Sequence, residues 1–413
     1  VWRQASLRVE EIAIDSELGE VEQQMLERVA SRVDQIDVRE APLLRLFIAQ
    51  DEARGRWLVS QLFHHLAIDH TTMQVMQQEA QAILLGQLDQ LPRSQPYRNF
   101  VAQSRLGVSR EEHEAFFTQM LADVEEPTAP FGLTDVHGDG SGVSQAHRSV
   151  DAGLSRRLRE CTRALGVSAA SVCHLAWAQV LARVAGCEDV VFGTVLLGRM
   201  QGGEGADRAL GLFINTLPVR IRVGEEGVAD SARQTHRLLT QLLHHEHASL
   251  ALAQRCSRVA APTPLFSGLL NYRHSTAVTQ TTTSDAESQA GGRLLSAEER
   301  TNYPLMLAVD DLGEDFGLTA QVQSPIEPGR VCAYMHRALE VLVDALETAP
   351  DRPLYSLDVL PYAERQQLLV EWNEPAADYP SDCSLHQLFE AQVDRTPDAI
   401  ALLCDGDRFS YAV

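Results

Sequence analysis

A change of periodicity over residues 55–86 constrains the fold more than any other feature. Residues 56–63 (Arg-Trp-Leu-Val-Ser-Gln-Leu-Phe) are rich in apolar and aromatic side chains, which predicts a half-buried strand. Residues 71–84 carry apolar side chains at helical spacing, and Thr71-x-x-Gln74 has the form of a capping box, which predicts a helix starting there and ending before Gly86. A strand, a tight turn and a helix therefore follow one another.

The turn between these elements is His-His-Leu-Ala-Ile-Asp-His, residues 64–70. Successive side chains on a strand point to opposite faces, so we expect one of His64 and His65 to face a site and the other to pack. A histidine at a strand end is suited to general base catalysis, because its usual pKa of about 6.5 leaves it mostly neutral at neutral pH. Asp69 is placed to orient an imidazole or to pair with an arginine.

Two other interpretations apply to the same residues. Two adjacent histidines beside an apolar strand can be an ordinary packed pair. His64, His65, Asp69 and His70 are also metal-ligating types, but the opposed faces of the first two disfavour a shared ion, and no familiar zinc spacing is present. We therefore assign no metal.

Charge and composition exclude several partner classes. The chain has 413 residues, 35 Lys+Arg against 57 Asp+Glu, and a net charge of −22. This balance argues against binding a nucleic acid or an anionic membrane surface. With 45% hydrophobic residues, the length suffices for two or more domains with buried cores.

The cysteines and the apolar runs bear on cellular location. The seven cysteines lie at irregular spacing without a Cys-x-x-Cys pair, which indicates reduced thiols. No signal peptide or membrane-spanning apolar run is visible, so we predict a cytoplasmic protein.

The order of predicted elements indicates an α/β protein with two lobes. Residues 137–142 have the composition of a flexible crossing. After it, residues 154–165 and 168–185 predict two helices, ended by Gly166 and Gly186, and residues 190–196 predict a buried strand. Helix and strand alternate as in an α/β lobe.

Four further segments are given structural interpretations. His244-His245-Glu246-His247 lacks the second histidine of a His-Glu-x-x-His metal motif and is predicted to be a solvated helix face. Cys173-His174 is predicted to pack in a core, because adjacent helical residues diverge by about 100°. Residues 202–205 lack the lysine of a phosphate loop and predict a mobile turn, and residues 276–292 predict an exposed loop.

The motif at residues 64–69 resembles the His-His-x-x-x-Asp-Gly signature of the condensation domains of nonribosomal peptide synthetases, relatives of chloramphenicol acetyltransferase. Further segments are similar to that family in the family's order: Pro96–Phe100, with Asn99 in place of an acidic residue, Val191–Arg199, Leu210–Arg220, Pro264–Phe266, Asn271–Arg273 and Glu299–Pro304. Together they cover nearly everything from residue 1 to about 350.

The resemblance implies a fold of two chloramphenicol acetyltransferase-like lobes that form a V-shaped pseudo-dimer around a tunnel. It implies an N-terminal lobe at 1–145, truncated at its start, and a C-terminal lobe at 146–350. A linker at 351–383 and the first elements of an adenylation domain at 384–413 would follow. The order of these segments indicates a multidomain assembly line.

The resemblance also assigns roles to single residues. It places His65 in the tunnel beside the reacting thioester, with His64 and Asp69 as supports, and it suggests Arg220 as the partner of Asp69. Asn215 would support the site, and Gly193, Gly198 and Arg199 would belong to the strand and loop that floor the tunnel. His70 replaces the family's glycine, a residue that permits positive φ and close backbone approach to a ligand.

The implied reaction is formation of a peptide bond between a donor acyl or peptidyl thioester and an acceptor aminoacyl thioester. Upstream and downstream carrier domains would deliver both on phosphopantetheine arms, so this chain itself would bind no cofactor. Ester formation by the same site is one alternative. A catalytically inactive domain that docks carriers is another, motivated by His70 and by the missing N-terminal portion.

Overall fold

The computed structural model describes residues 5–14, 20–30, 36–138, 140, 142–199, 205–274, 295, 301–375 and 382–412. The predicted loop at 276–292, Glu299 and Arg300, and residues 202–204 of the predicted turn lie outside the described residues, as do positions 139 and 141 of the predicted crossing. The chain divides into two compact units, Val1–Leu360 and Pro361–Val413, which are described separately.

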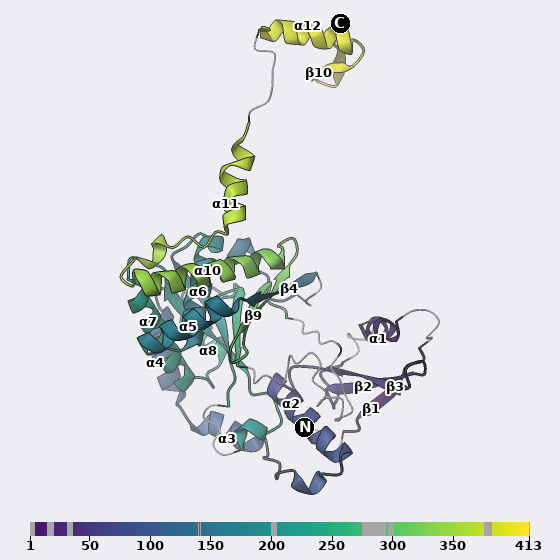
Figure 1. The fold of residues 1–413 in the computed structure, drawn as a ribbon, viewed down its shortest axis with the longest axis vertical. Helices are drawn as coiled ribbons and strands as arrows, with labels where there is room; N and C mark the ends of the chain where they lie inside the picture. Colours follow the sequence, from purple (N-terminus) through teal and green to yellow (C-terminus); the bar gives the residue numbers. More distant parts are fainter. Residues whose placement is uncertain are drawn as a thin grey trace. The chain divides into compact units, whose positions relative to one another are not determined.

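The first unit contains a small sheet that carries the histidine motif. Its strands are β1 (Arg8–Glu11), β2 (Leu44–Asp51) and β3 (Arg56–Phe63), with β1 parallel and β3 antiparallel to the central β2. Helix α1 (Val21–Ala30) covers one face and forms a small core with side chains such as Phe47 (Figure 1). The predicted strand at 56–63 is confirmed.

A larger mixed sheet of six strands has the order β4-β9-β8-β7-β5-β6. The strands are β4 (Val143–Val150), β5 (Asp189–Leu196), β6 (Asn215–Arg222), β7 (Gly268–His274), β8 (Leu305–Asp311) and β9 (Phe316–Gln323). The β5–β7 and β7–β8 pairs are parallel and the others are antiparallel. The predicted strand at 190–196 is the buried strand β5. Arg199, three residues after its end, contacts Asp69 of the histidine motif.

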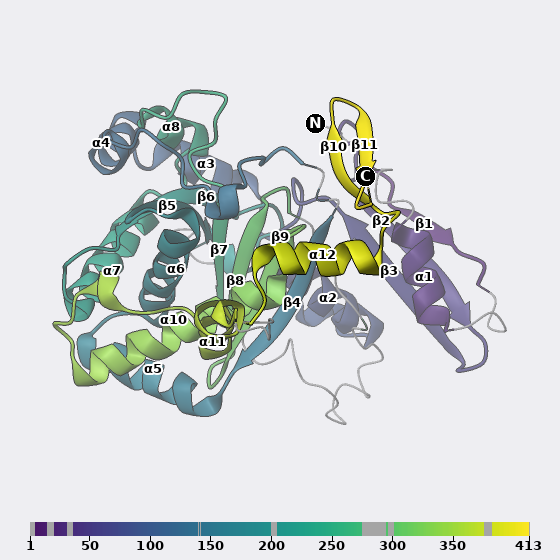
Figure 2. The ribbon, with the colours of Figure 1, turned by 90° about the horizontal axis from the view of Figure 1, so that it is seen from above.

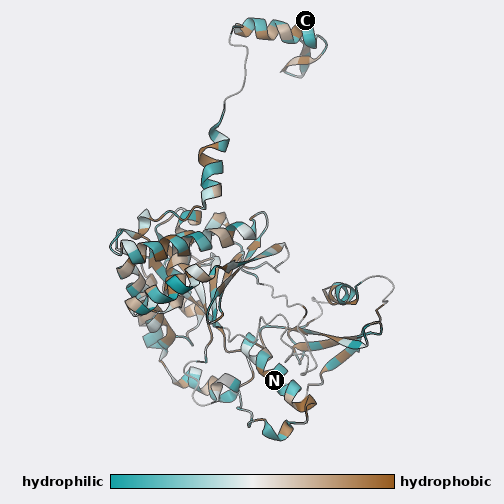
Figure 3. Cartoon of the chain, viewed as in Figure 1, coloured by the Kyte–Doolittle hydropathy of each residue, from teal (hydrophilic) through white to brown (hydrophobic). Residues whose placement is uncertain are grey.

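Four helices cover one face of the larger sheet (Figure 2). They are α5 (Ala152–Leu165), α6 (Ala169–Ala185), α7 (Val228–His244) and α10 (Pro328–Thr348). Buried residues of α6 run continuously from Ser171 to Ala182, because α6 packs against both α7 and α10 as well as the sheet. The other three helices carry both hydrophilic and hydrophobic residues along their length (Figure 3).

The caps of α5 and α6 explain why these helices begin and end where the sequence predicts. Asp151 and Ser168 each accept a hydrogen bond from a backbone N–H of the first turn. Gly166 and Gly186 follow the helices with φ of 69° and 68°, a left-handed conformation that glycine adopts without steric cost. Both predicted helices are confirmed.

The remaining helices of the first unit lie along the chain between the two sheets, between strands of the large sheet, or after α10. They are α2 (His70–Leu84), α3 (Arg98–Leu106), α4 (Arg110–Leu121), α8 (Leu250–Arg255) and the short 3-10 helices Leu88–Gln90, Pro130–Gly132, Ala206–Arg208 and Leu354–Ser356. Phe117 and Leu121 of α4, which precede the predicted boundary at residue 145, belong to the core of the large sheet.

The second unit is small. It contains α11 (Tyr362–Leu369), the 3-10 helix Glu371–Asn373, α12 (Leu385–Arg395) and an antiparallel hairpin of β10 (Ile400–Cys404) and β11 (Asp407–Ser410).

Within the part of the chain that the structure describes, no single helix is long and apolar enough to cross a membrane. The bent pair α5–α6 meets the length and composition test together, but α6 is the central buried helix of the large core.

Candidate functional site

The histidine motif begins where β3 ends. The backbone N–H of His64 still donates to the carbonyl of Leu43 (3.0 Å), one step beyond the last strand pair. The chain then turns, since Ala67 N donates to the carbonyl of His64 (3.0 Å) and Leu66 N donates to His64 Nδ1 (3.1 Å). The His64 ring is therefore engaged with the backbone of the turn.

His65 lies on this turn and is half-buried. Its ring meets the ring of Phe63 edge-on, with centroids 5.8 Å apart, and its Nδ1 lies 3.2 Å from the carbonyl oxygen of Ile68. A carbonyl can only accept a hydrogen bond, so Nδ1 carries the proton in this contact. In the neutral ring, Nε2 is then the nitrogen with the lone pair.

Asp69 is the N-cap of α2 and is almost fully buried, at 1% exposure. Its carboxylate accepts hydrogen bonds from Thr72 N (2.7 Å), Phe213 N (3.0 Å) and Arg199 Nη2 (2.9 and 3.1 Å to the two oxygens). A buried charge is tolerated when it is paired and hydrogen-bonded in this way. The sequence placed the start of this helix at Thr71. That prediction is wrong, because the Asp69 carboxylate is the group that satisfies the first turn.

Arg199 ties the end of the large sheet to α2. Its Nη1 donates to the carbonyls of Ala206 (2.7 Å) and Ala209 (2.9 Å), and its guanidinium lies 3.8 Å over the ring of Phe213. The same guanidinium binds Asp69, so one side chain fixes two chain segments at once.

The prediction that Arg220 pairs with Asp69 is wrong. Arg220 lies on β6 and binds Asp189 (Nε to Oδ1, 2.9 Å) and Asp123 (Nη2 to Oδ2, 3.0 Å). The reason is that β6 places Arg220 opposite Val191, near the start of β5, whereas Arg199 follows the end of β5, where it contacts the start of α2.

Two glycines permit this close approach. At Gly198, with φ of +64°, an added Cβ would lie 2.0 Å from the carbonyl oxygen of Phe213. At Gly211, with φ of +151°, an added Cβ would lie 2.3 Å from the ring of Tyr97. Gly193, also expected at the site, lies within β5, where an added Cβ would meet Leu269 at 2.3 Å. Gly193 is therefore a packing position in the strand that leads to the site.

The segment 211–213 is held from behind by aromatic residues of the 96–100 region. The Tyr97 hydroxyl donates to the carbonyl of Leu212. The rings of Tyr97 and Phe100 lie with centroids 5.3 and 4.4 Å from that of Phe213. Sequence reasoning found these segments only through the family resemblance, and it missed the role of Phe213 as a donor to Asp69.

Asn215 supports the scaffold at a distance from Asp69. Its Nδ2 donates to the carbonyls of Glu246 (2.8 Å) and Ala248 (2.7 Å), which fixes the turn after α7. It is not among the groups that contact the carboxylate of Asp69 directly.

His70 is the first residue of α2 and is exposed, with its Nε2 3.2 Å from Nε2 of Gln74. In the described ranges, the non-glycine residues with positive φ are Phe131 and Asp405. His70 therefore does not adopt the positive φ that a glycine would permit, because it is the first residue of a helix.

The two other histidine-containing segments differ in outcome. Cys173 and His174 are buried in α6, and burial raises the pKa of Cys173 to about 12 and lowers the pKa of His174 to about 4, so the predicted core packing is confirmed. His244 is exposed at the end of α7, as predicted, but His245 and Glu246 are buried. The prediction of a solvated face is wrong for these two because the helix ends at His244 and the chain folds inward.

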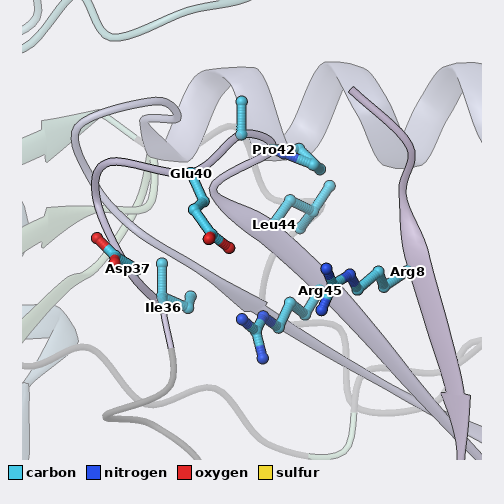
Figure 4. A pocket seen from close by; sticks show the side chains of 8 residues that line it. Arg8, Ile36, Asp37, Glu40, Pro42, Leu44 and Arg45 are labelled. Carbon is cyan, nitrogen blue, oxygen red and sulfur yellow. The ribbon is translucent and has the colours of Figure 1, made fainter. Parts of the chain in front are cut away.

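No group of three or more metal-ligating side chains occurs within the described segments. A small pocket of about 30 Å³ lies beside the small sheet (Figure 4). Its lining includes Arg8, Asp37, Glu40 and Arg45, and none of the motif residues. These opposed charges do not single out one class of ligand.

The sequence matches the condensation-domain family over residues 1–369. It is 48% identical over 411 residues to malpinin synthetase and 47% identical over 412 residues to malpibaldin synthetase, both from Mortierella alpina. All of this chain is matched in both cases, but it spans only 5% and 7% of those proteins.

Solved structures share the fold. The four-domain nonribosomal peptide synthetase AB3403, bound to AMP and glycine, aligns with a TM-score of 0.72 at 15% identity, over 100% of this chain and 32% of that one. The first condensation domain of the CDA synthetase aligns with a TM-score of 0.63 at 17% identity, over 87% of this chain and 79% of that one.

The chain therefore belongs to the condensation-domain family of the nonribosomal peptide synthetases, with the two-lobe α/β fold of that family. Domains of this class are acyltransferases that form an amide bond between two carrier-bound substrates.

Proposed function

We propose that residues 64–69 form the site at which this chain joins a donor acyl or peptidyl thioester to an acceptor aminoacyl thioester. The observation that carries the proposal is the contact of His65 Nδ1 with the carbonyl of Ile68, next to the clamped carboxylate of Asp69. The hydrogen bond to Ile68 restrains the imidazole on the turn. In the neutral ring it leaves the lone pair on Nε2.

In the proposed reaction the acceptor amine attacks the carbonyl carbon of the donor thioester. A C–N bond forms, the C–S bond breaks, and the donor's pantetheine leaves as a thiol. His65 Nε2 accepts a proton from the attacking amine or holds the amine in line. In the best intramolecular reactions, correct orientation of the reacting groups lowers the activation barrier by about 7–11 kcal/mol. An imidazole held in place can therefore contribute whether it accepts the proton or only orients the amine.

His64 and Asp69 act as supports in this proposal. His64 closes the turn through its backbone and its Nδ1, and Asp69 anchors the turn to α2 and to Arg199. Neither residue needs to touch the substrate. The alternative of an inactive domain is motivated partly by His70 in place of a glycine. Because residue 70 lies in a helix, its backbone does not need the positive φ that glycine permits.

The proposed partners are an upstream and a downstream carrier domain, each with a phosphopantetheine arm. We further propose that residues 384–413 begin an adenylation domain in the same polypeptide, with residues 351–383 as the linker and the predicted lobes before it. The large size of the two fungal relatives supports a multidomain context. The cytoplasm is the proposed location, a proposal supported by the seven irregularly spaced cysteines.

The deciding experiment is a condensation assay on the full-length protein, with donor and acceptor carriers loaded. We expect the wild type to form product and His65→Ala to lose nearly all of it. The matched control is His137→Ala, because His137 is an exposed histidine outside the motif. Analysis of the product separates an amide from an ester. Activity of His65→Ala at the wild-type rate would sink the assignment, as would a wild type inactive with every plausible pair of carriers.

A further inference from the structure

We infer that Thr72 is a positioning residue of this site, whose hydroxyl sets the orientation of His65 without touching substrate. The inference rests on the proposed function, since it concerns the same turn. Thr72 is the third residue of α2 and is buried, at 2% exposure.

The hydroxyl of Thr72 uses all of its hydrogen-bonding capacity on chain segments far away in the sequence. It donates to the carbonyl of Gly211 (2.7 Å) and accepts from Gly211 N (3.1 Å) and from Arg199 Nη2 (3.0 Å). A threonine hydroxyl has one donor and two acceptor lone pairs, so the match is complete. An ordinary helical threonine would instead bond to a carbonyl of its own helix, as Thr235 does with Ser231 (2.9 Å).

The hydroxyl of Thr72 contacts Arg199 and Gly211, which are part of the surroundings of the Asp69 carboxylate. Arg199 Nη2 is shared between Thr72 and the carboxylate of Asp69. Gly211 is two residues before Phe213, whose backbone N–H donates to the same carboxylate. The Thr72 backbone N–H is the third donor to it. Thr72 therefore contacts Arg199 directly, contacts the segment that carries Phe213 through Gly211, and supplies one donor to the Asp69 carboxylate itself.

The path continues from Asp69 to the imidazole. Ile68 immediately precedes Asp69, and its carbonyl is the acceptor for His65 Nδ1. A shift of Asp69 moves this carbonyl and with it the ring and the preferred tautomer of His65. Small misplacements of a reacting group, on the order of 1 Å, can lower a rate on the order of 10²-fold.

The test compares Thr72→Val, which keeps the shape and removes the hydroxyl, with Thr72→Ser, which keeps the hydroxyl. In the condensation assay with both carriers loaded, we expect Thr72→Val to lower kcat on the order of 10²-fold with KM for the carriers unchanged. Thr72→Ser should restore a rate close to the wild type. Thr235→Val is the matched control, because it removes a buried threonine hydroxyl that bonds only within its own helix.

Equal unfolding free energies for Thr72→Val and Thr235→Val, with kcat lost only in the first, would support positioning over a general loss of stability. If Thr72→Val does not fold, Thr72→Cys replaces it, since a thiol is a weak donor and acceptor, and an intermediate kcat is expected. A wild-type kcat for either variant, with His65→Ala inactive, would overturn the role of Thr72 alone. An active His65→Ala variant would overturn the proposed function instead.

Discussion

At the scale of single residues, the site is organised around one buried carboxylate. Asp69 receives donors from α2, from the 211–213 segment and from Arg199, and each comes from a different part of the chain. The residue expected to meet the substrate, His65, contacts the carbonyl of Ile68, the residue before Asp69. The orientation of the His65 imidazole in the proposed reaction therefore depends on residues that do not contact the substrate.

Because the partner of Asp69 is Arg199 and not Arg220, substitutions at the two arginines should differ in their effects. Arg199→Ala leaves the Asp69 carboxylate buried without its cation, and we expect a loss of about 3–5 kcal/mol in the free energy of unfolding, with loss of condensation. Arg220→Ala should cost less stability, because its partners Asp123 and Asp189 are partly exposed and can be hydrated, and it should keep condensation activity. Denaturant titration and the condensation assay measure both. Equal behaviour of the two variants would contradict the assignment.

At the scale of elements, the site forms where the end of β5 meets the start of α2. Gly198 and Arg199 directly follow the strand, Asp69 is the N-cap of the helix, and Thr72 lies in its first turn. The 211–213 segment lies between them because Gly198 leaves room for the Phe213 carbonyl and Gly211 leaves room for Tyr97. Glycine is thus required at positions 198 and 211 because the neighbouring chain segments approach too closely for a Cβ atom.

This close approach predicts the result of adding one methyl group. Gly198→Ala places a Cβ 2.0 Å from the Phe213 oxygen and forces a positive φ on alanine, so the 211–213 segment must move away from Asp69. We expect a lower free energy of unfolding and a lower condensation rate. Gly224→Ala is the control, because an added Cβ there meets nothing within 4 Å. A Gly198→Ala variant as active and as stable as the control would show that this contact is dispensable.

At the scale of the whole molecule, the large core extends further along the chain than the large sheet. After α10, the chain packs Leu354, Leu357 and Val359 into that core, and the backbone N–H of Leu354 donates to the carbonyl of Glu226 (2.9 Å). Leu360, the last residue of the first unit, also packs against this core.

The end of the core predicts where truncation becomes harmful. A chain that ends at Leu360 should keep the free energy of unfolding of the first unit. A chain that ends at Arg352 should lose the burial of Leu354, Leu357 and Val359, each worth about 1.5–3 kcal/mol. Denaturant unfolding of the two truncated chains measures the difference. Equal stability would mean that the core ends before residue 353.

Local sequence was sufficient for the elements that have strong periodicity and clear caps. The strand at 56–63 and the two helices that end at Gly166 and Gly186 follow from apolar spacing and capping residues alone. The start of α2 was misplaced because two capping candidates, Asp69 and Thr71, lie within one turn. The burial of His245 was missed because nothing in the local pattern marks the end of α7.

By itself, the sequence determined the identity and spacing of the reactive groups, His64, His65 and Asp69, and the strand-turn-helix on which they lie. It also placed Asp69 where its carboxylate could orient an imidazole or pair with an arginine. Only the tertiary structure decided that the partner is Arg199, and that Thr72 and Phe213 complete the arrangement. The physical reason is that Arg199 and Phe213 are 130 and 144 residues away from Asp69, and a contact at that separation leaves no periodicity in the chain.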